Sequence, residues 1–248
     1  MLQISSDSKT RSRPAQYNAF GLPPGPKASC PYATTGCGGC WQRPAKGLKL
    51  HTCYVDKLQR ARPNIGKVLD RNFALLKSRK TADAMAQDLK RMFEEFRAAE
   101  AASGNPEPCF RIHWSGDLYS RNYAVALAQA ISEFPDIRFW MYTRSFAFVV
   151  PELVALPNLV LFLSADPCNT GAAIDCMRWI RRWRGGKRVR LAFMGEPTER
   201  AKAYLKRIRV KTGYCPVDSG KMEREGACVN KCRFCVDEFS SAVVFEVK

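Results

Sequence analysis

Histidine, long apolar runs and acidic residues are all scarce in this sequence, and each shortage excludes a class of protein. Histidine occurs only twice among 248 residues, so a metal site in this chain would consist mainly of cysteine thiolates. The sequence has no run of eighteen apolar residues, which a membrane-spanning helix requires. Its first residues, MLQISSDSKTRSRP, lack the apolar core of a secretory signal. We therefore expect a cytoplasmic protein with no membrane partner.

Internal repeats and low-complexity segments are absent as well, and hydrophobic residues make up 46% of the chain. This composition excludes disordered, collagen-like and coiled-coil proteins. The length is sufficient for one large domain or two small ones with a sizeable buried core.

Basic residues greatly outnumber acidic residues. The chain has 40 Lys and Arg against 23 Asp and Glu, which gives a formal net charge of +17 and a pI of about 9.6. An excess of this size favours a polyanionic partner, most often nucleic acid. A basic surface that only keeps the protein soluble is the simpler alternative.

Short apolar segments alternate with helical segments from about residue 81 onward. The helix that opens at Thr81 has apolar residues at helical spacing and ends near Gly104. The segments that read as strands are 110–114, 137–143, 159–165 and 188–194, with possible further strands at 17–20 and at the C-terminus. The predicted helices after them cover about 123–134, 151–156, 172–184 and 198–210.

This alternation is typical of βαβ units and a parallel sheet. The strands are apolar almost throughout, which indicates that both sheet faces are covered. About six strands predict an α/β fold, an open, partial (β/α)6-type barrel of parallel strands with cysteine-rich loops at its N- and C-terminal ends. We expect residues 1–27 to form a basic mobile arm and a Pro/Gly loop, residues 28–212 the partial barrel, and residues 213–248 a Cys-rich segment with a possible last strand.

Cysteine is abundant, and seven of the eleven cysteines fall in two compact groups. Reduced thiols that cluster in a cytosolic chain indicate metal binding rather than disulfides. The first group is Cys30, Cys37 and Cys40, in SCPYATTGCGGCW, where three glycines let the backbone wrap closely around a cluster. Three thiolates can hold three irons of a 4Fe-4S cluster and leave the fourth open, whereas zinc prefers four ligands, with Cys53 as the fourth. The spacing by itself leaves iron–sulfur and zinc open.

The second group is Cys215, Cys228, Cys232 and Cys235. Its last three, in CVNKCRFC, have the Cys-x3-Cys-x2-Cys spacing of radical S-adenosylmethionine (SAM) enzymes, in which this motif usually stands near the N-terminus. Four thiolates close the coordination of a second cluster or of a structural zinc ion. We expect the three isolated cysteines to be small buried hydrophobes: Cys109, Cys168 and Cys176.

Four predicted strands end in short polar motifs, the last of them Gly195-Glu196. A helix cap explains one such ending, but four at one edge of a parallel sheet indicate a ligand pocket. Small residues let a ligand approach the backbone, and carboxylates can bind an ammonium group or ribose hydroxyls. The candidate cofactor-binding residues are Ser115, Gly116, Asp117, Arg144, Ser145, Ser164 and Asp166. We expect His113 to be packed in the core, and we assign no catalytic residue.

Together these motifs resemble a phage-encoded radical SAM-like family. The resemblance extends over about residues 28–236 and rests on SCPYATTGCGGCW, RIHWSGDLYS, FWMYTRS, LFLSADP and GYCPVDSGK…CVNKCRFC. In radical SAM enzymes a Gly-Gly-Glu motif after the second strand holds the methionyl amino group, and Ser115-Gly116-Asp117 matches its position and chemistry but not its letters. In these enzymes the ends of later strands hold the methionyl carboxylate and the ribose of SAM. The candidates Arg144, Ser145, Ser164 and Asp166 correspond to these positions only by their order along the chain.

The resemblance implies cofactors and a chemistry. A 4Fe-4S cluster with an open iron binds SAM, and one electron from an external donor breaks a carbon–sulfur bond to give a 5′-deoxyadenosyl radical. This radical abstracts an unactivated hydrogen, while the protein binds and orients the reactants. We expect the first cysteine group to hold this cluster and the second group to hold another cluster or zinc. Because Cys-x3-Cys-x2-Cys is missing near the start of the chain, the opposite assignment stays open.

Radical SAM-like proteins of phages include enzymes of thymidine hypermodification. The resemblance therefore implies a DNA-acting isomerase that converts an N-linked glycyl thymidine to the Cα-linked form, which would protect phage DNA from restriction in the host cytoplasm. Another radical modification of nucleic acid, such as methylation or methylthiolation, is the alternative enzyme. The non-enzyme alternative is a zinc-bound nucleic-acid-binding protein.

The predicted helices at 172–184 and 198–210 are rich in cations. Trp179 and Trp183 stand four residues apart among them, and a basic face with interleaved aromatic rings can bind phosphates and stack bases. The alternative is a solvated helix whose tryptophans face the core. The candidate DNA-binding residues are Arg178, Arg181, Arg182, Lys206 and Arg207.

Overall fold

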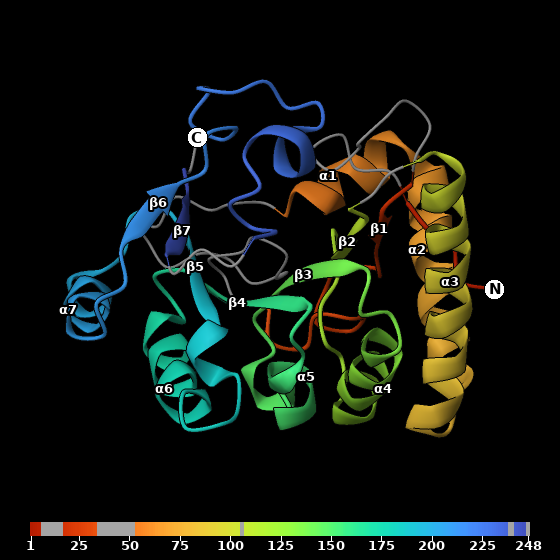
Figure 1. The fold of residues 1–248 in the computed structure, drawn as a ribbon, viewed down its shortest axis with the longest axis horizontal. Coiled ribbons are helices and arrows are strands. Elements are labelled where there is room, and N and C mark those ends of the chain that lie inside the picture. The colour runs from red at the N-terminus through yellow and green to blue at the C-terminus, as the bar shows by residue number, and fades with distance from the viewer. Residues whose placement is uncertain (6–16, 34–52, 105–106, 238–240, 247–248) are drawn as a thin grey trace.

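The computed structural model describes residues 1–5, 17–33, 53–104, 107–237 and 241–246, which form a seven-stranded sheet with helices packed against it (Figure 1). The strands are β1 (Ala19–Phe20), β2 (Cys109–Ile112), β3 (Arg138–Thr143), β4 (Leu159–Ala165), β5 (Arg190–Met194), β6 (Thr212–Tyr214) and β7 (Ala242–Phe245). The α-helices are α1 (Tyr54–Ala61), α2 (Pro63–Ser78), α3 (Ala82–Ala102), α4 (Arg121–Ser132), α5 (Pro151–Ala155), α6 (Thr170–Ile180) and α7 (Glu199–Arg207). Two short 3-10 helices (Phe146–Phe148, Gly186–Arg188) and one π-helical turn (Ala227–Lys231) complete the set.

All neighbouring strands of this sheet are parallel, in the order β1-β2-β3-β4-β5-β7-β6. The sheet is open, with β1 and β6 at its two edges. Because βαβ connections are right-handed, consecutive order from β1 to β5 places the intervening helices on one face. Figure 1 shows α4, α5 and α6 together on one side of the sheet, while the chain that follows β6 returns over the other side.

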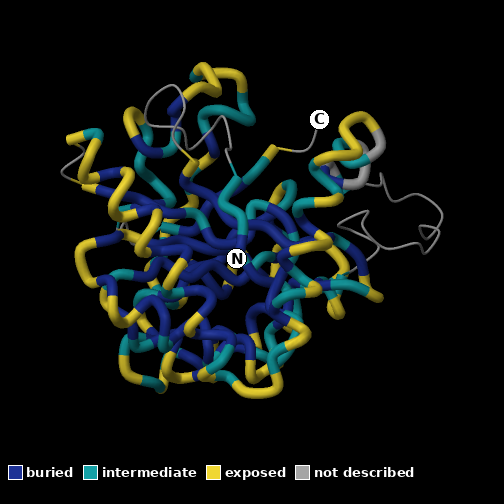
Figure 2. The backbone as a smooth tube through the Cα atoms, turned by 90° about the vertical axis from the view of Figure 1, so that its right-hand side faces the viewer, coloured by how far each residue is buried: buried dark blue, intermediate teal, exposed yellow. Residues whose placement is uncertain are grey.

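Alternate residues of each strand supply the two faces of the sheet. On β3, Phe139 and Met141 belong to the core beneath the helices, whereas Trp140 packs with Val229 and Val236 of the C-terminal segment. Both faces are therefore buried, as the continuous apolar strands predict. In Figure 2 the buried backbone occupies the middle of the molecule and the exposed backbone lies mainly at its periphery.

Side-chain caps fix the beginnings of two helices that follow strands. The Ser120 hydroxyl accepts a hydrogen bond from the N–H of Tyr123 (3.2 Å), and the Thr198 hydroxyl accepts one from the N–H of Ala201 (3.3 Å). Ser120 lies between β2 and α4, and Thr198 lies between β5 and α7. These caps therefore set the lengths of two loops at the carboxyl edge of the sheet.

The strands and helices predicted after residue 80 are all present, with ends that differ by a few residues. The prediction of about six strands is too low, because β6 has only three residues and no apolar run that would predict it. β6 and β7 also place parts of the C-terminal segment within the sheet. α1 and α2 were not predicted, although α2 buries Leu69, Asn72 and Leu76 at helical spacing.

The described ranges contain no helix that is both long and apolar enough to cross a membrane.

Candidate functional site

The carboxyl ends of the parallel strands meet at one edge of the sheet, where Asp117 is the centre of a buried network. Its carboxylate accepts four hydrogen bonds, from the Thr143 hydroxyl (2.6 Å) and from the N–H groups of Leu118 (2.7 Å), Arg144 (2.8 Å) and Ser145 (3.2 Å). Burial raises the pKa of Asp117, and the hydrogen bonds oppose that increase. A carboxylate has about four acceptor positions, and these four hydrogen bonds occupy them. Asp117 therefore joins the loops after β2 and β3. That Asp117 also contacts a ligand stays a prediction.

Arg144 extends this network to β4 and β5. Its guanidinium pairs with Asp166, which follows β4, and donates to Sδ of Met194 at the end of β5 (2.8 Å). The Arg144 side chain is 10% exposed and that of Asp166 only 1%, so the pair is nearly desolvated. Asp166 also accepts hydrogen bonds from the N–H groups of Cys168 (2.7 Å) and Asn169 (3.2 Å). The loops after β3 and β4 and the end of β5 are thus held together by one ion pair and its partners.

The loop after β1 packs directly on the loop after β2. The N–H of Leu22 donates to the Ser115 carbonyl (2.9 Å), and the Ser115 hydroxyl donates to the Leu22 carbonyl (2.7 Å). Gly116 has φ +83°, and a Cβ at this position would lie 2.4 Å from the Ser29 hydroxyl oxygen. Only glycine permits this approach, because an L side chain would be strained and would collide with the neighbouring loop. The packing brings the following residue, Cys30, to the same edge of the sheet.

Cys30 is the one member of the first cysteine group that lies within the described residues. Burial, together with the nearby Asp117 and Cys53, raises the pKa of its thiol to about 12. Cys53, the possible fourth ligand, is therefore within electrostatic reach of Cys30. Cys37 and Cys40 lie outside the described residues, so the convergence of the three thiols stays a prediction.

Two buried polar atoms near this edge have no hydrogen-bond partner among the described residues, Oγ of Ser145 and Nδ1 of His113. His113 has φ +57°, and its Nε2 lies 2.8 Å from the Tyr123 hydroxyl oxygen. Burial lowers the pKa of His113 to about 3, so the imidazole is neutral at neutral pH. Its position in the core agrees with the sequence prediction. An unpartnered buried hydroxyl is costly, which makes Ser145 a candidate for ligand contact.

The other predicted cofactor residue on β4, Ser164, is half-buried, and its carbonyl accepts a hydrogen bond from the Asn169 side chain (3.1 Å). All seven candidates therefore lie at the carboxyl edge, but they differ in availability. Ser115 and Asp117 are engaged by the protein itself, whereas the hydroxyl of Ser145 has no partner in the described structure.

The four C-terminal cysteines gather on the sheet face opposite the helices. Cys215 follows β6, while Cys228 lies in the π-helical turn and Cys232 directly after it. The pKa of Cys235 is raised to about 12, first by burial and then by the other three cysteines. The Tyr142 hydroxyl opposes this increase by donating a hydrogen bond to the sulfur. All three of these cysteines therefore lie within electrostatic reach of Cys235.

Within the described ranges, no group of three or more His, Cys, Asp or Glu side chains is placed so that it could hold a metal ion. The C-terminal cysteines are thus neighbours, but they are not arranged as ligands. Their chemistry is still that of an all-thiol donor set, which suits zinc or an iron–sulfur cluster.

The isolated cysteines differ from one another. Cys109 is buried, as predicted, and Cys176 is half-buried. The prediction for Cys168 is wrong, because this residue is exposed in the loop after β4.

The predicted DNA-binding residues of α6 and α7 surround one aromatic ring. Arg178 and Arg207 lie over the ring of Tyr204, with distances of 5.4 and 5.3 Å from their guanidinium carbons to the ring centroid. Arg178 also pairs with Asp175 (2.9 Å), whereas Lys206 is exposed near the end of α7. Part of the predicted basic face is therefore bound within the protein.

Arg181 and Arg182 lie directly after α6, and the charge of Arg181 still opposes the increase that burial causes in the pKa of Tyr204. They follow α6 and precede β5, so they belong to the amino edge of the sheet, opposite Asp117. The structure therefore separates the predicted cofactor residues from these two cations.

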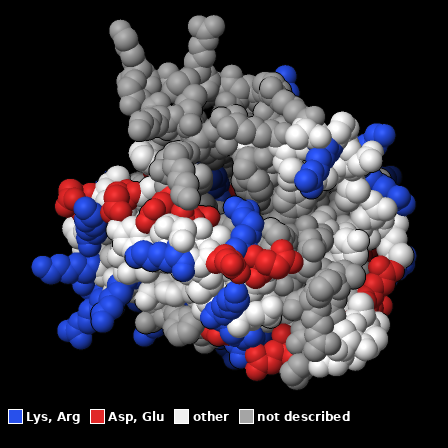
Figure 3. Space-filling model, turned by 90° about the horizontal axis from the view of Figure 1, so that it is seen from above, with Lys and Arg blue, Asp and Glu red and all other residues white. Residues whose placement is uncertain are grey.

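Figure 3 shows the molecule from above the view of Figure 1. On the described part of that face, Lys and Arg are interspersed with Asp and Glu.

The sequence matches a known protein family over nearly its whole length. Residues 3–238, which include both cysteine groups, match the family described as Gene product 88. The chain belongs to the Gene product 88 family.

Two curated relatives support this assignment, and both come from phages. The Gene 88 protein of Mycobacterium phage D29 is 30% identical over 237 residues, covering 93% of this chain and 88% of the relative. The Gene 88 protein of Mycobacterium phage L5 is 31% identical over 225 residues, covering 89% of this chain and 83% of the relative. No solved structure matches this Gene product 88 chain.

Three partners at the two sites escaped the sequence analysis. Thr143 and Ser29 are small polar residues that directly precede the predicted site residues Arg144 and Cys30. This position in the motifs could have indicated that they belong to the site. Tyr142 could be placed on a strand, but the hydrogen bond to Cys235 joins segments 93 residues apart, and nothing local indicates it.

Proposed function

We propose that this Gene product 88 family member is a radical SAM-type enzyme of phage DNA hypermodification, which isomerises an N-linked glycyl thymidine to the Cα-linked form. The observation that carries the proposal is the position of Cys30. The loop after β1 packs Ser29 against Gly116 and holds the next residue, Cys30, near Asp117, at the carboxyl edge where α/β folds bind their ligands. The substrate rests on the sequence resemblance and on the phage origin of the two relatives.

The topology supports the partial-barrel part of the proposal. Strands β1 to β5 follow one another in consecutive order, with helices on one face, as in singly wound (β/α) barrels. A doubly wound sheet reverses its strand order and places helices on both faces. Because the sheet does not close, its edge strands β1 and β6 are not joined, and we expect a large substrate such as nucleic acid to approach between these edges.

The residue chemistry at the carboxyl edge fits these cofactors. Cys30, Cys37 and Cys40 would hold the cluster, and the buried hydroxyl of Ser145 could bond a carboxylate or a ribose of SAM. When bound, the cluster and SAM supply a radical that abstracts a hydrogen atom. The C-terminal thiols would hold a second cluster or zinc, although the described residues show no ligand arrangement there.

The chain's own contribution is to position groups and to exclude water. Asp117 holds the loops after β2 and β3 together, and Arg144 joins them to the loop after β4 through Asp166 and to the end of β5 through Met194. These groups are buried, so their charges and dipoles are fixed before a ligand binds. The C-terminal segment covers the other face of the sheet beside Trp140.

Anaerobic purification followed by product analysis tests the proposal. The expected protein is brown and contains iron and acid-labile sulfide. With dithionite and SAM it should produce 5′-deoxyadenosine, and with DNA that carries glycyl thymidine it should produce the isomerised nucleoside, both read by mass spectrometry. Substituting the exposed Cys168 by Ala provides the control.

The same experiment separates the alternatives. Methylated or methylthiolated nucleosides would favour the other class of radical enzyme over the isomerase. A colourless protein that contains zinc and binds DNA, with no SAM cleavage, would contradict the enzyme and favour the nucleic-acid-binding module.

A further inference from the structure

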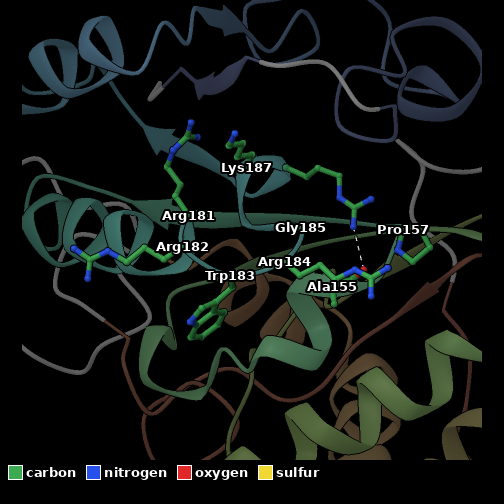
Figure 4. A pocket seen from close by; sticks show the side chains of 9 residues that line it. Ala155, Pro157, Arg181, Arg182, Trp183, Arg184, Gly185 and Lys187 are labelled. Carbon is green, nitrogen blue, oxygen red and sulfur yellow. Dashed lines mark hydrogen bonds between the residues drawn. The ribbon is translucent and has the colours of Figure 1, made fainter.

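A basic pocket of about 700 Å³ opens at the amino edge of the sheet (Figure 4). It lies between the end of α5 and the loop that joins α6 to β5. Five of the residues that line it are cations, and the lining, which lies entirely within the described chain, includes no Asp or Glu. These cations are Arg181, Arg182, Arg184, Lys187 and Arg188.

The pocket is a built structure rather than a loose surface loop. Gly185 has φ +76°, and a Cβ there would lie 2.4 Å from the Val154 carbonyl oxygen. A Cβ on Gly186 would lie 1.9 Å from the Ile180 carbonyl oxygen. Arg188 ties the loop to α5 by donating to the Ala155 carbonyl (3.0 Å). The turn therefore needs both glycines, and its packing fixes the position of the cations around it.

Three other cations of the pocket are available to a ligand. Arg182, Arg184 and Lys187 are exposed, and in the described part of the chain none of them forms an ion pair. In Figure 4 Arg181 and Lys187 extend to the same side, while Arg184 runs toward Ala155. Like charges around one pocket repel one another, and a bound polyanion relieves that repulsion. Guanidinium groups also match the geometry of phosphate oxygens.

Two indoles, Trp179 and Trp183, lie next to these cations. Trp183 lines the pocket, and its ring lies 4.2 Å from that of Trp179, centroid to centroid, in an edge-on arrangement. Trp179 is 51% exposed, so one face of the pair is open to an aromatic partner. An unpaired base can stack on such a ring, whereas the bases of a duplex already stack on one another.

We propose that this pocket binds single-stranded nucleic acid, with its phosphates on Arg182, Arg184 and Lys187 and one base stacked on Trp179. The choice of nucleic acid rests on the proposed function, but the binding site does not depend on radical chemistry. The pocket lies about 20 Å from the carboxyl edge, since β4 has seven residues at about 3.3 Å each. It therefore anchors a strand away from the site of chemistry, and its loss should raise KM rather than lower kcat.

Binding of a labelled single-stranded oligonucleotide, followed by fluorescence anisotropy across a salt series, tests this site. Replacing Arg182, Arg184 and Lys187 together by Gln should reduce the slope of log K against log salt by about 2, since each phosphate contact on a single strand contributes roughly 0.7. A control variant that replaces Lys67, Arg71 and Lys80 by Gln removes the same charge from exposed positions around α2 and should leave the slope unchanged.

The indole is tested separately. Trp179→Ala should weaken binding of the single strand by roughly 5- to 150-fold, the range for loss of one stacked base, without changing the salt slope. Trp179→Phe should recover part of that affinity. The parent protein should bind the single strand more tightly than a duplex of the same sequence.

Three results would overturn the inference. One is a triple Gln variant whose affinity and salt slope equal those of the parent. Another is equal affinity for duplex and single strand together with no effect of Trp179→Ala. The last is binding of polyglutamate as tight as that of the oligonucleotide. None of these measurements uses SAM, so a protein that binds the strand here but never cleaves SAM would refute the proposed function and leave this site intact.

Discussion

Asp117 offers the clearest quantitative test of the network at the carboxyl edge. Its two carboxylate oxygens accept four hydrogen bonds at 2.6 to 3.2 Å, three of them from backbone N–H groups. In Asp117→Asn one oxygen becomes an amide that donates, so whichever way the side chain turns, at least one buried N–H loses its acceptor and faces another donor. A buried donor without a partner costs about 1–3 kcal/mol, and a hydrogen bond to a charged group contributes about 1.5–3 kcal/mol. We therefore expect Asp117→Asn to lower the free energy of unfolding by about 2–4 kcal/mol at neutral pH.

Urea unfolding followed by circular dichroism measures this loss as a lower midpoint with an unchanged slope. Asp136→Asn is the matched control, because the Asp136 side chain is 50% exposed and lies 3.9 Å from Arg97. Such a surface pair contributes little, so the control should change stability by less than about 0.5 kcal/mol. If Asp117→Asn is no more destabilising than Asp136→Asn, the network does not hold the loops in the way argued.

Three further predictions concern the glycine, histidine and cysteine positions. Gly116→Ala should be about 1–3 kcal/mol more destabilising in urea than Gly104→Ala, because both have positive φ but only the Cβ at 116 meets other atoms; equal losses would contradict the loop packing. Because the His113 pKa is lowered to about 3, the unfolded chain binds one more proton than the folded chain between about pH 6.5 and 3. The free energy of unfolding should therefore fall as the pH falls through that window. His113→Gln should remove this contribution from the pH profile of stability. Cys232→Ser should lower the metal content by one site and expose the C-terminal segment to protease, whereas Cys168→Ser should do neither.

The parallel sheet could be predicted because its signal is local. Apolar runs such as LVLFLSA, alternating with amphipathic helices, indicate covered parallel strands whichever partner each strand has. The prediction missed β6, because the three residues TGY pair with β7 through backbone bonds that leave no side-chain pattern. It also missed α2, whose buried stripe contains Asn72. That residue is buried because its side chain accepts from the Gln3 N–H (2.8 Å) and donates to the Gly21 carbonyl (3.2 Å), which are long-range contacts.

The candidate site was predictable in position but not in detail. Parallel strands bring their carboxyl ends to one edge, so the polar strand endings necessarily lie together there. Which atoms remain for a ligand depends on tertiary contacts: Ser115 is used by Leu22, while Ser145 keeps a hydroxyl with no partner in the described structure. The position of Arg181 and Arg182 at the opposite edge follows from where α6 ends relative to β5, a boundary that the sequence indicated four residues too late.

The predicted division into a barrel and a separate Cys-rich C-terminal segment could be examined only in the structure. Between Cys215 and Cys235 the sequence is mostly polar, so apolar burial by itself does not predict how this stretch is ordered. In the structure Cys215, Val229 and Val236 are buried against Trp140, so part of that order comes from packing on the open face of the sheet. If the C-terminal cysteines hold a metal ion, its removal should loosen this segment without unfolding the sheet beneath it.

In the proposed function, the first cysteine group holds the cluster that cleaves SAM. Its most direct test is 5′-deoxyadenosine formation, under anaerobic conditions with dithionite, by the parent protein and by the Cys37→Ala and Cys232→Ala variants. We expect the parent to produce 5′-deoxyadenosine, Cys37→Ala to produce none, and Cys232→Ala still to produce it. Cleavage that survives Cys37→Ala and is lost in Cys232→Ala would contradict the claim and assign the cluster to the C-terminal cysteines.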